Sequence, residues 1–140
     1  MKQLIVSLLL TMLLVIAMTP VVPAAPQPLL PPCPASPNCV SSLATDSHAI
    51  GPLHFTGAGP AALARLQELL QKRSDTRIVA ATDETLRVEF RTLLGFVDDG
   101  LFVLDAPNGV IQMRSAARTG YWDLGKNRRR LEEIRRAFEH

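Results

Sequence analysis

Apolar side chains recur at helical spacing in two segments of the chain, one in the middle and one at the C-terminus. The first segment, residues 60–74, begins with a proline, which is favoured at the first position of a helix. The second follows Asn127, a residue type that can cap a helix. Both segments carry a stripe at the spacing of a buried helix face: Ala62, Leu63, Leu66, Leu69 and Leu70 in the first, and Leu131, Ile134 and Phe138 in the second. The pattern predicts two amphipathic helices.

Between these segments the period of the apolar positions shortens to two, which is the period of a half-buried strand. Residues 85–91 alternate strictly, with Leu86, Val88 and Phe90 between polar neighbours. The segment LFVLD is apolar on both faces, which is typical of a central strand. Further strands are predicted where apolar or β-branched residues cluster or alternate: 77–81, 101–105 and 110–114, with a fifth at 52–55 as an alternative.

Short turns connect the predicted strands. Asp99-Gly100 is a hairpin-turn dipeptide, and residues 107–109, Pro-Asn-Gly, form another turn signal. Short connections make neighbouring strands antiparallel, and two amphipathic helices need an apolar sheet face to cover. The sequence therefore predicts an α+β fold, a two-layer sandwich with two helices on one face of an antiparallel sheet of four to five strands. The other sheet face is expected to be polar: Arg87, Glu89, Arg91, Gln112 and Arg114.

The N-terminus has the three parts of a secretory signal peptide. A short positive start precedes an apolar run at 4–18, and Val22 and Ala24 place small residues at the −3 and −1 positions of a cleavage site. The run is shorter than the roughly 20 residues of a spanning helix, although an uncleaved membrane anchor is the alternative. We expect three parts along the chain: a signal peptide at 1–24, a proline-rich tether at 25–37 and a single domain at 38–140.

Export changes how the charge and the cysteines are interpreted. The chain has 15 basic and 13 acidic side chains, and loss of Lys2 with the leader leaves 14 and 13, so the exported body is nearly neutral. A nucleic-acid partner is therefore not indicated. Cys33 and Cys39 would meet the oxidising conditions of the periplasm or the extracellular space, where we expect them to form a disulfide. Two free thiols are the alternative.

Four ordered motifs resemble a known family. They are PNCVSS at 37–42, AIGPL at 49–53, EFRTLLGFVDD at 89–99 and RSAARTGYWDLGKNRRRLEEIRRAF at 114–138. Together they are similar to domain of unknown function 1499, a family of exported and membrane-associated proteins, over roughly residues 33–138. The family has no established activity. The resemblance implies only that the motif residues gather in one functional or structural feature.

The candidate binding residues lie in the last two motifs. Loops held by a rigid scaffold commonly carry function, and arginines can hold a carboxylate or phosphate through two hydrogen bonds. Asp98-Asp99 could bind a cation or share a proton, but it also has the composition of a turn. Asp123 could cap the last helix or pair with Arg114 or Arg118, and Asp98 or Asp99 could join them in an ion-pair network. The candidates are Arg91, which we expect near Arg114, together with Asp98, Asp99, Arg114, Arg118, Tyr121, Asp123, Asn127 and Arg128.

Other polar residues fit less specific roles. On the last helix, oppositely charged residues four apart predict a solvated face: Arg128 with Glu132, Arg129 with Glu133, and Glu132 with Arg136. His48 and His54 lack the companions of a catalytic or metal site, and Cys39 with His48 is a usable pair only if the cysteine is reduced.

The sequence favours one function class over two others. We expect an exported, non-catalytic binding domain without a cofactor or a metal. Its partner would be an anionic small molecule, a lipid headgroup or an envelope protein. The alternatives are a hydrolase that uses the same carboxylates and arginines, and a structural or assembly factor of the envelope.

Overall fold

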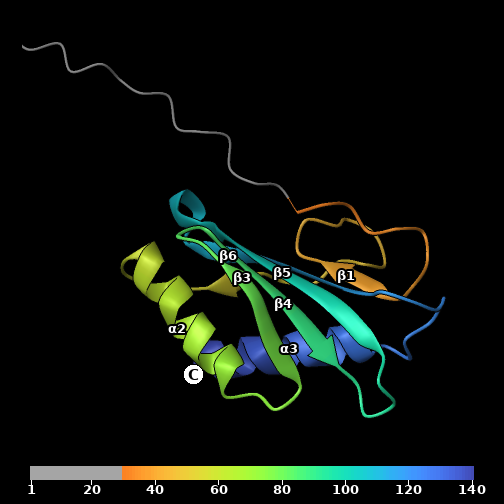
Figure 1. Ribbon diagram of the computed structural model, residues 1–140. Helices are drawn as coiled ribbons and strands as arrows, with labels where there is room; N and C mark the ends of the chain where they lie inside the picture. The colour runs from red at the N-terminus through yellow and green to blue at the C-terminus, as the bar shows by residue number, and fades with distance from the viewer. Residues whose placement is uncertain (1–29) are drawn as a thin grey trace, which may run out of the picture.

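An antiparallel sheet carries two helices on one face in the computed structural model, which describes residues 30–140 (Figure 1). The strands follow the order β1-β6-β5-β4-β3, and β2 pairs with β6 beyond the end of β1. The elements are β1 (Cys39–Ser41), β2 (Leu53–His54), α2 (Gly59–Gln71), β3 (Thr76–Ala81), β4 (Thr85–Arg91), β5 (Val97–Asp105), the 3-10 turn η1 (Ala106–Asn108), β6 (Val110–Ala117) and α3 (Lys126–Glu139). The predicted α+β fold with both helices on one face is confirmed, with six strands.

The core lies between the helices and the covered face of the sheet. Leu86, Val88 and Phe90 of β4 are buried as the alternation predicts, because successive strand residues point to opposite faces. The apolar stripes of both helices pack against them in one cluster, which also contains Phe102 and Met113 from the central strands. The α2 helix ends at Gln71, three residues before the predicted end at Ser74.

One predicted turn is wrong. Asp99 and Gly100 lie inside β5, and the chain reverses earlier, at residues 92–96, where the amide of Phe96 donates to Thr92 Oγ1. Gly100 is required by packing: a Cβ at this position would lie 2.5 Å from the Phe90 ring and 2.6 Å from Val88. The Asp-Gly dipeptide therefore belongs to a crowded central strand and not to a turn. Glycine is needed there because other side chains approach the backbone closely.

The second predicted turn is confirmed, and the predicted helix cap is wrong. Residues 106–109 form η1 and a left-handed Gly109 with φ 66°. The last helix begins at Lys126 with Gly125 at its N-cap, so that Asn127 lies within the first turn and is fully buried. Its amide group reaches into the protein, where it makes long-range contacts described below.

The N-terminal part of the domain joins the sheet through β1, a strand that the sequence did not predict. Cys33 and Cys39 form the expected disulfide, with 5.7 Å between their Cα atoms. Leu30 is buried at 7% exposure, so the described end of the proline-rich segment packs on the domain. The predicted signal peptide at 1–24 lies outside the described residues. Within residues 30–140, no helix combines the length and apolar character needed to cross a membrane.

Candidate functional site

The paired carboxylates Asp98 and Asp99 lie on opposite faces of the sheet. Both belong to β5, and neighbouring strand residues alternate in direction. Asp98 points toward the helices and is 3% exposed, whereas Asp99 lies on the open face. The two carboxylates therefore do not form one cation or proton-sharing site, and each needs its own interpretation.

Asp98 belongs to a buried polar network that the sequence did not predict as such. Arg130 of α3, 3% exposed, donates from Nη1 to Asp98 Oδ2 at 2.8 Å and to Asn127 Oδ1 at 3.2 Å. Its guanidinium also lies 4.6 Å from the centre of the Phe90 ring, in a cation–π arrangement. Ser115 on β6 donates to the same Asn127 oxygen. The network therefore connects α3 to both central strands.

Asp123 fastens the start of α3. Its carboxylate accepts the backbone amides of Gly125 at 2.9 Å and Asn127 at 2.8 Å, together with the Asn127 side-chain amide at 2.8 Å. Asn38, next to β1, adds a second anchor because its side chain donates to the Gly120 carbonyl. Asp123 therefore accepts backbone amides at the start of α3 as a cap would, although Gly125 holds the N-cap position, and the predicted pairing with Arg114 or Arg118 is wrong. These side chains therefore hold the loop between β6 and α3 in place.

On the open face, three strands share an ion-pair network. Arg118 donates to Asp99 Oδ2 at 3.1 Å and to Glu89 Oε1 at 3.0 Å, and Arg77 donates to Glu89 Oε2 at 2.9 Å. Arg91 lies 3.7 Å from the same Glu89 oxygen. The hydrogen bonds from Arg77 and then Arg118 lower the pKa of Glu89. The expected network between Asp99 and Arg118 is confirmed.

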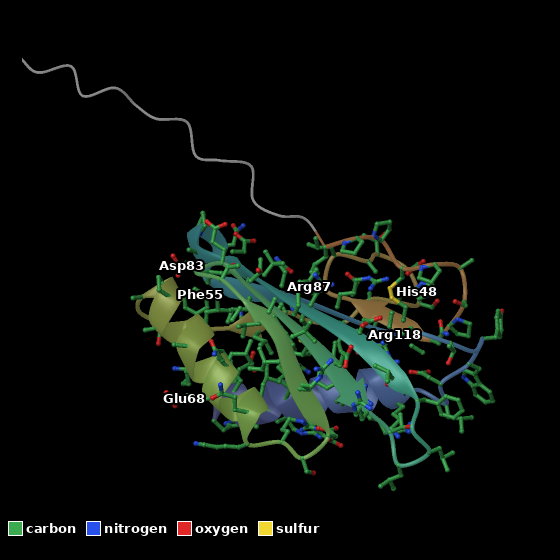
Figure 2. All side chains as sticks on the ribbon, in the orientation of Figure 1. His48, Phe55, Glu68, Asp83, Arg87 and Arg118 are labelled. Atoms are coloured by element: carbon green, nitrogen blue, oxygen red, sulfur yellow. A yellow bond between two sulfur atoms is a disulfide. The ribbon has the colours of Figure 1, made fainter. Side chains whose placement is uncertain are left out.

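Arg114 and Arg87 lie on the same face but outside that network. Both flank Leu101 in one row across β4, β5 and β6, so their Cα atoms are about 10 Å apart at the usual strand spacing. Within residues 30–140, neither arginine forms an ion pair. Arg114 donates to the Pro32 carbonyl at 3.3 Å. Figure 2 shows Arg87 and Arg118 on the side of the sheet away from the helices.

The environment of Arg114 is the least satisfied on this face. Its Nε is buried and has no hydrogen-bond partner among the described residues. Burial lowers the pKa of the guanidinium, an effect that the charge of Asp99 partly offsets. Arg87 and Arg114 border a shallow depression of about 400 Å³, which Pro31, Val79 and Leu101 also line. The predicted neighbour of Arg114 is wrong: Arg91 pairs with Val97, four residues along β5 from Leu101.

The remaining candidates have separate positions. Tyr121 is exposed on the loop before α3. Arg128 donates to the carbonyls of Ala49 at 2.6 Å and Ser47 at 2.8 Å, which ties α3 to the segment between β1 and β2. The predicted pairs four residues apart on α3 are wrong: Glu132 pairs with Arg135, and Arg129 donates to the Leu124 carbonyl. The helix charges form local contacts at other spacings.

His48 forms a short polar chain near the disulfide. Its Nδ1 lies 2.9 Å from Asp46 Oδ1, and its Nε2 lies 3.1 Å from the Ser36 carbonyl oxygen. Both partners are acceptors, and the Asp46 hydrogen bond is the main reason that the pKa of His48 is raised. Because Cys39 is oxidised in the disulfide, it offers no thiol to His48. Among the described residues, no three His, Cys, Asp or Glu side chains come together as a metal site.

The comparison with protein families agrees with the motifs. A family model described as "Protein of unknown function (DUF1499)" matches residues 29–138. The chain belongs to the DUF1499 family. No curated protein and no solved structure matches this DUF1499 chain. The resemblance of the four motifs is thereby confirmed, and the function has to be argued from the geometry.

The DUF1499 motifs correspond largely to the buried polar network. The motif residues that hold α3 and its preceding loop on the sheet are Asn38, Asp98, Ser115, Asp123, Asn127, Arg128 and Arg130. Sequence reasoning missed Asn38, Ser115 and Arg130, although all three stand inside the quoted motifs. A signal was present in the spacing of Arg130, because it lies four residues before Ile134 and eight before Phe138, on the face of the predicted buried stripe.

Proposed function

We propose that this protein is an exported binding domain that holds an anionic group between Arg87 and Arg114 on the open face of the sheet. The observation that carries this proposal is the half-buried Arg114, whose Nε has no hydrogen-bond partner and which forms no salt bridge in the described residues, although Asp99 lies in the same depression. A buried donor without a partner has a free-energy cost, which an anion would remove. Arg87, in the same row, would supply a second cation.

The surroundings indicate which chemistry would suit the site. A guanidinium binds carboxylate and phosphate oxygens through two parallel hydrogen bonds. Pro31, Val79 and Leu101 line the same depression and would contact an apolar group. An anion with a short hydrocarbon portion therefore fits this surface better than a bare ion.

The neighbouring ion pairs support binding rather than hydrolysis. Beside the depression, Arg118 forms salt bridges with both Glu89 and Asp99, and these contacts hold the wall of the depression in place. The other carboxylates that a hydrolase could use are engaged elsewhere, Asp98 with Arg130 and Asp123 with the start of α3. Export is supported by the disulfide, because such bonds persist in oxidising compartments.

Calorimetric titration with octyl phosphate and octanoate tests the site. We expect at least one of them to bind, and we expect Arg87→Ala and Arg114→Ala each to weaken that binding at least about tenfold, because each removes one of two cations facing the anion. Arg136→Ala, on the exposed side of α3, is the control of equal charge and should leave the affinity unchanged. Absence of binding by both compounds, or an equal loss in Arg136→Ala, would contradict the proposal.

A further inference from the structure

Six of the eight large hydrophobic side chains that are exposed in the described residues lie on two loops. The loop between β4 and β5 carries Leu93, Leu94 and Phe96, and the loop between β6 and α3 carries Tyr121, Trp122 and Leu124. Leu93 is 103% exposed and Leu94 is 85% exposed, so these side chains project fully into solvent. We call these six residues the apolar tip.

Both loops leave the same end of the sheet. Val97, where the first loop enters β5, pairs with Arg91 and also accepts the Arg118 amide at 3.0 Å, where the second loop begins. In Figure 1 the two loops lie together at the right-hand end of the view, away from α2. The apolar tip is therefore one local surface built from two distant parts of the sequence.

The backbone of the apolar tip is fixed while its side chains point outward. Thr92 accepts the Phe96 amide at 3.0 Å, and Asn38 and Asp123 hold the second loop at Gly120 and Gly125. Leu124 has φ 56°, a left-handed conformation that a leucine rarely adopts. Strained backbone of this kind points to a functional constraint. Solvent exposure of the tip is thus built into the fold.

We propose that the apolar tip docks into the interfacial region of an anionic lipid membrane. Trp and Tyr prefer the headgroup level of bilayers, and Phe and Leu insert just below it. The charges beside the tip suit anionic lipids: Lys126 and Arg129, whose Nη1 donates to the Leu124 carbonyl, form no ion pair among the described residues. Arg91 and Arg118 contact Glu89 and Asp99 instead, and the Asp123 carboxylate is turned to the start of α3.

The shape of the apolar tip favours a membrane over a protein partner. A protein interface has a tightly packed core of complementary shape, whereas Leu93 and Leu94 project almost fully into solvent from their loop. A fluid lipid interface adapts to such projections. The proposal is independent of the anion site, because Arg87 and Arg114 lie in the middle of the open face and take no part in the tip.

Trp122 makes a direct test possible because it is the only tryptophan in the chain. The test adds vesicles of phosphatidylcholine with phosphatidylglycerol to protein recovered from the exported fraction and records tryptophan fluorescence. We expect a blue shift, and quenching by lipids brominated on their acyl chains. Both signals report the surroundings of the Trp122 ring itself, and the intact mass of the protein used shows whether it retains residues 1–24, which could insert into the vesicles on their own.

Matched variants assign the signal to the apolar tip. Leu93→Ser with Leu94→Ser should weaken vesicle partitioning at least about tenfold and keep the thermal midpoint, because both side chains are exposed. Leu43→Ser, an exposed leucine elsewhere, is the control and should leave partitioning unchanged.

Four results would overturn the proposal. They are an unchanged Trp122 spectrum, equal partitioning into pure phosphatidylcholine, an equal loss of partitioning in Leu43→Ser, and a concentration-dependent blue shift without vesicles. The last would assign the tip to contact between two copies of the chain.

Discussion

At the scale of single residues, His48 shows how two fixed acceptors change a titration. Only the doubly protonated imidazole can donate to both Asp46 and the Ser36 carbonyl, so the folded protein favours the charged ring. The hydrogen bond to Asp46, with a smaller contribution from Ser36, raises the pKa of His48 above its ordinary 6.5, and burial and then the charge of Arg128 oppose the shift. The contribution of His48 to the stability of the segment near the disulfide therefore depends on pH.

The sign of the resulting stability change follows from this shift. Because the folded-state pKa is higher than the unfolded one, the contribution is fully present below about pH 6.5 and is lost as the pH rises through the folded-state pKa. We expect urea midpoints of the wild type to decrease over that window, and His48→Gln to remove this component. A wild-type midpoint that rises over that window, or an identical pH dependence in His48→Gln, would contradict the assignment.

A second prediction at this scale concerns Asp98. Asp98→Ala leaves the buried Arg130 with only Asp75, whose carboxylate lies 3.6 Å from Nε, and loss of one member of a buried pair costs about 3–5 kcal/mol of unfolding free energy. Asp99→Ala, one residue along β5, removes an exposed contact with Arg118 and should cost less than about 1 kcal/mol. Denaturant unfolding of both variants measures the difference. Equal losses of unfolding free energy in the two variants would contradict the conclusion that the buried contact of Asp98 with Arg130 stabilises the fold more than the exposed contact of Asp99.

At the scale of elements, β5 depends on Gly100. Gly100→Ala places a methyl group 2.5 Å from the Phe90 ring and 2.6 Å from Val88, and neither can retreat because both are buried. Overpacking of this kind typically costs about 1–3 kcal/mol. Gly51→Ala is the control, since its nearest atom would lie 3.7 Å away, and it should stay within about 0.5 kcal/mol of the wild type. Thermal or urea unfolding compares the two variants, and a neutral Gly100→Ala would refute the packing argument.

At the scale of the whole molecule, the sheet separates three tasks. Its covered face and the two helices form the core, its open face carries the arginines, and one end carries the apolar tip (Figure 1). The buried network around Asn127 joins these parts, because it fixes α3 on the core and the loop that holds Tyr121 and Trp122. A motif that first suggested a binding surface therefore mostly holds α3 and its preceding loop on the sheet.

The sequence by itself determined the elements whose signal is local. Helical and strand periodicity depend only on neighbouring residues, so both helices, four strands and the α+β class were predictable. The same holds for Cys33 and Cys39, which lie close along the chain, and for the polar open face with Arg87 and Arg114.

Tertiary structure decided what depends on contacts between distant residues. Gly100 has the local signature of a turn, but the Phe90 ring on the next strand places it in β5. Asp98 and Asp99 are neighbours in sequence, yet the pleat sends one to Arg130 and the other to Arg118. Which arginines keep a buried donor without a partner, Arg114 and Arg130, and which loops meet at the tip, follows from how the strands and α3 pack. Such pairings are set by the burial of the whole core, and no short window of sequence contains them.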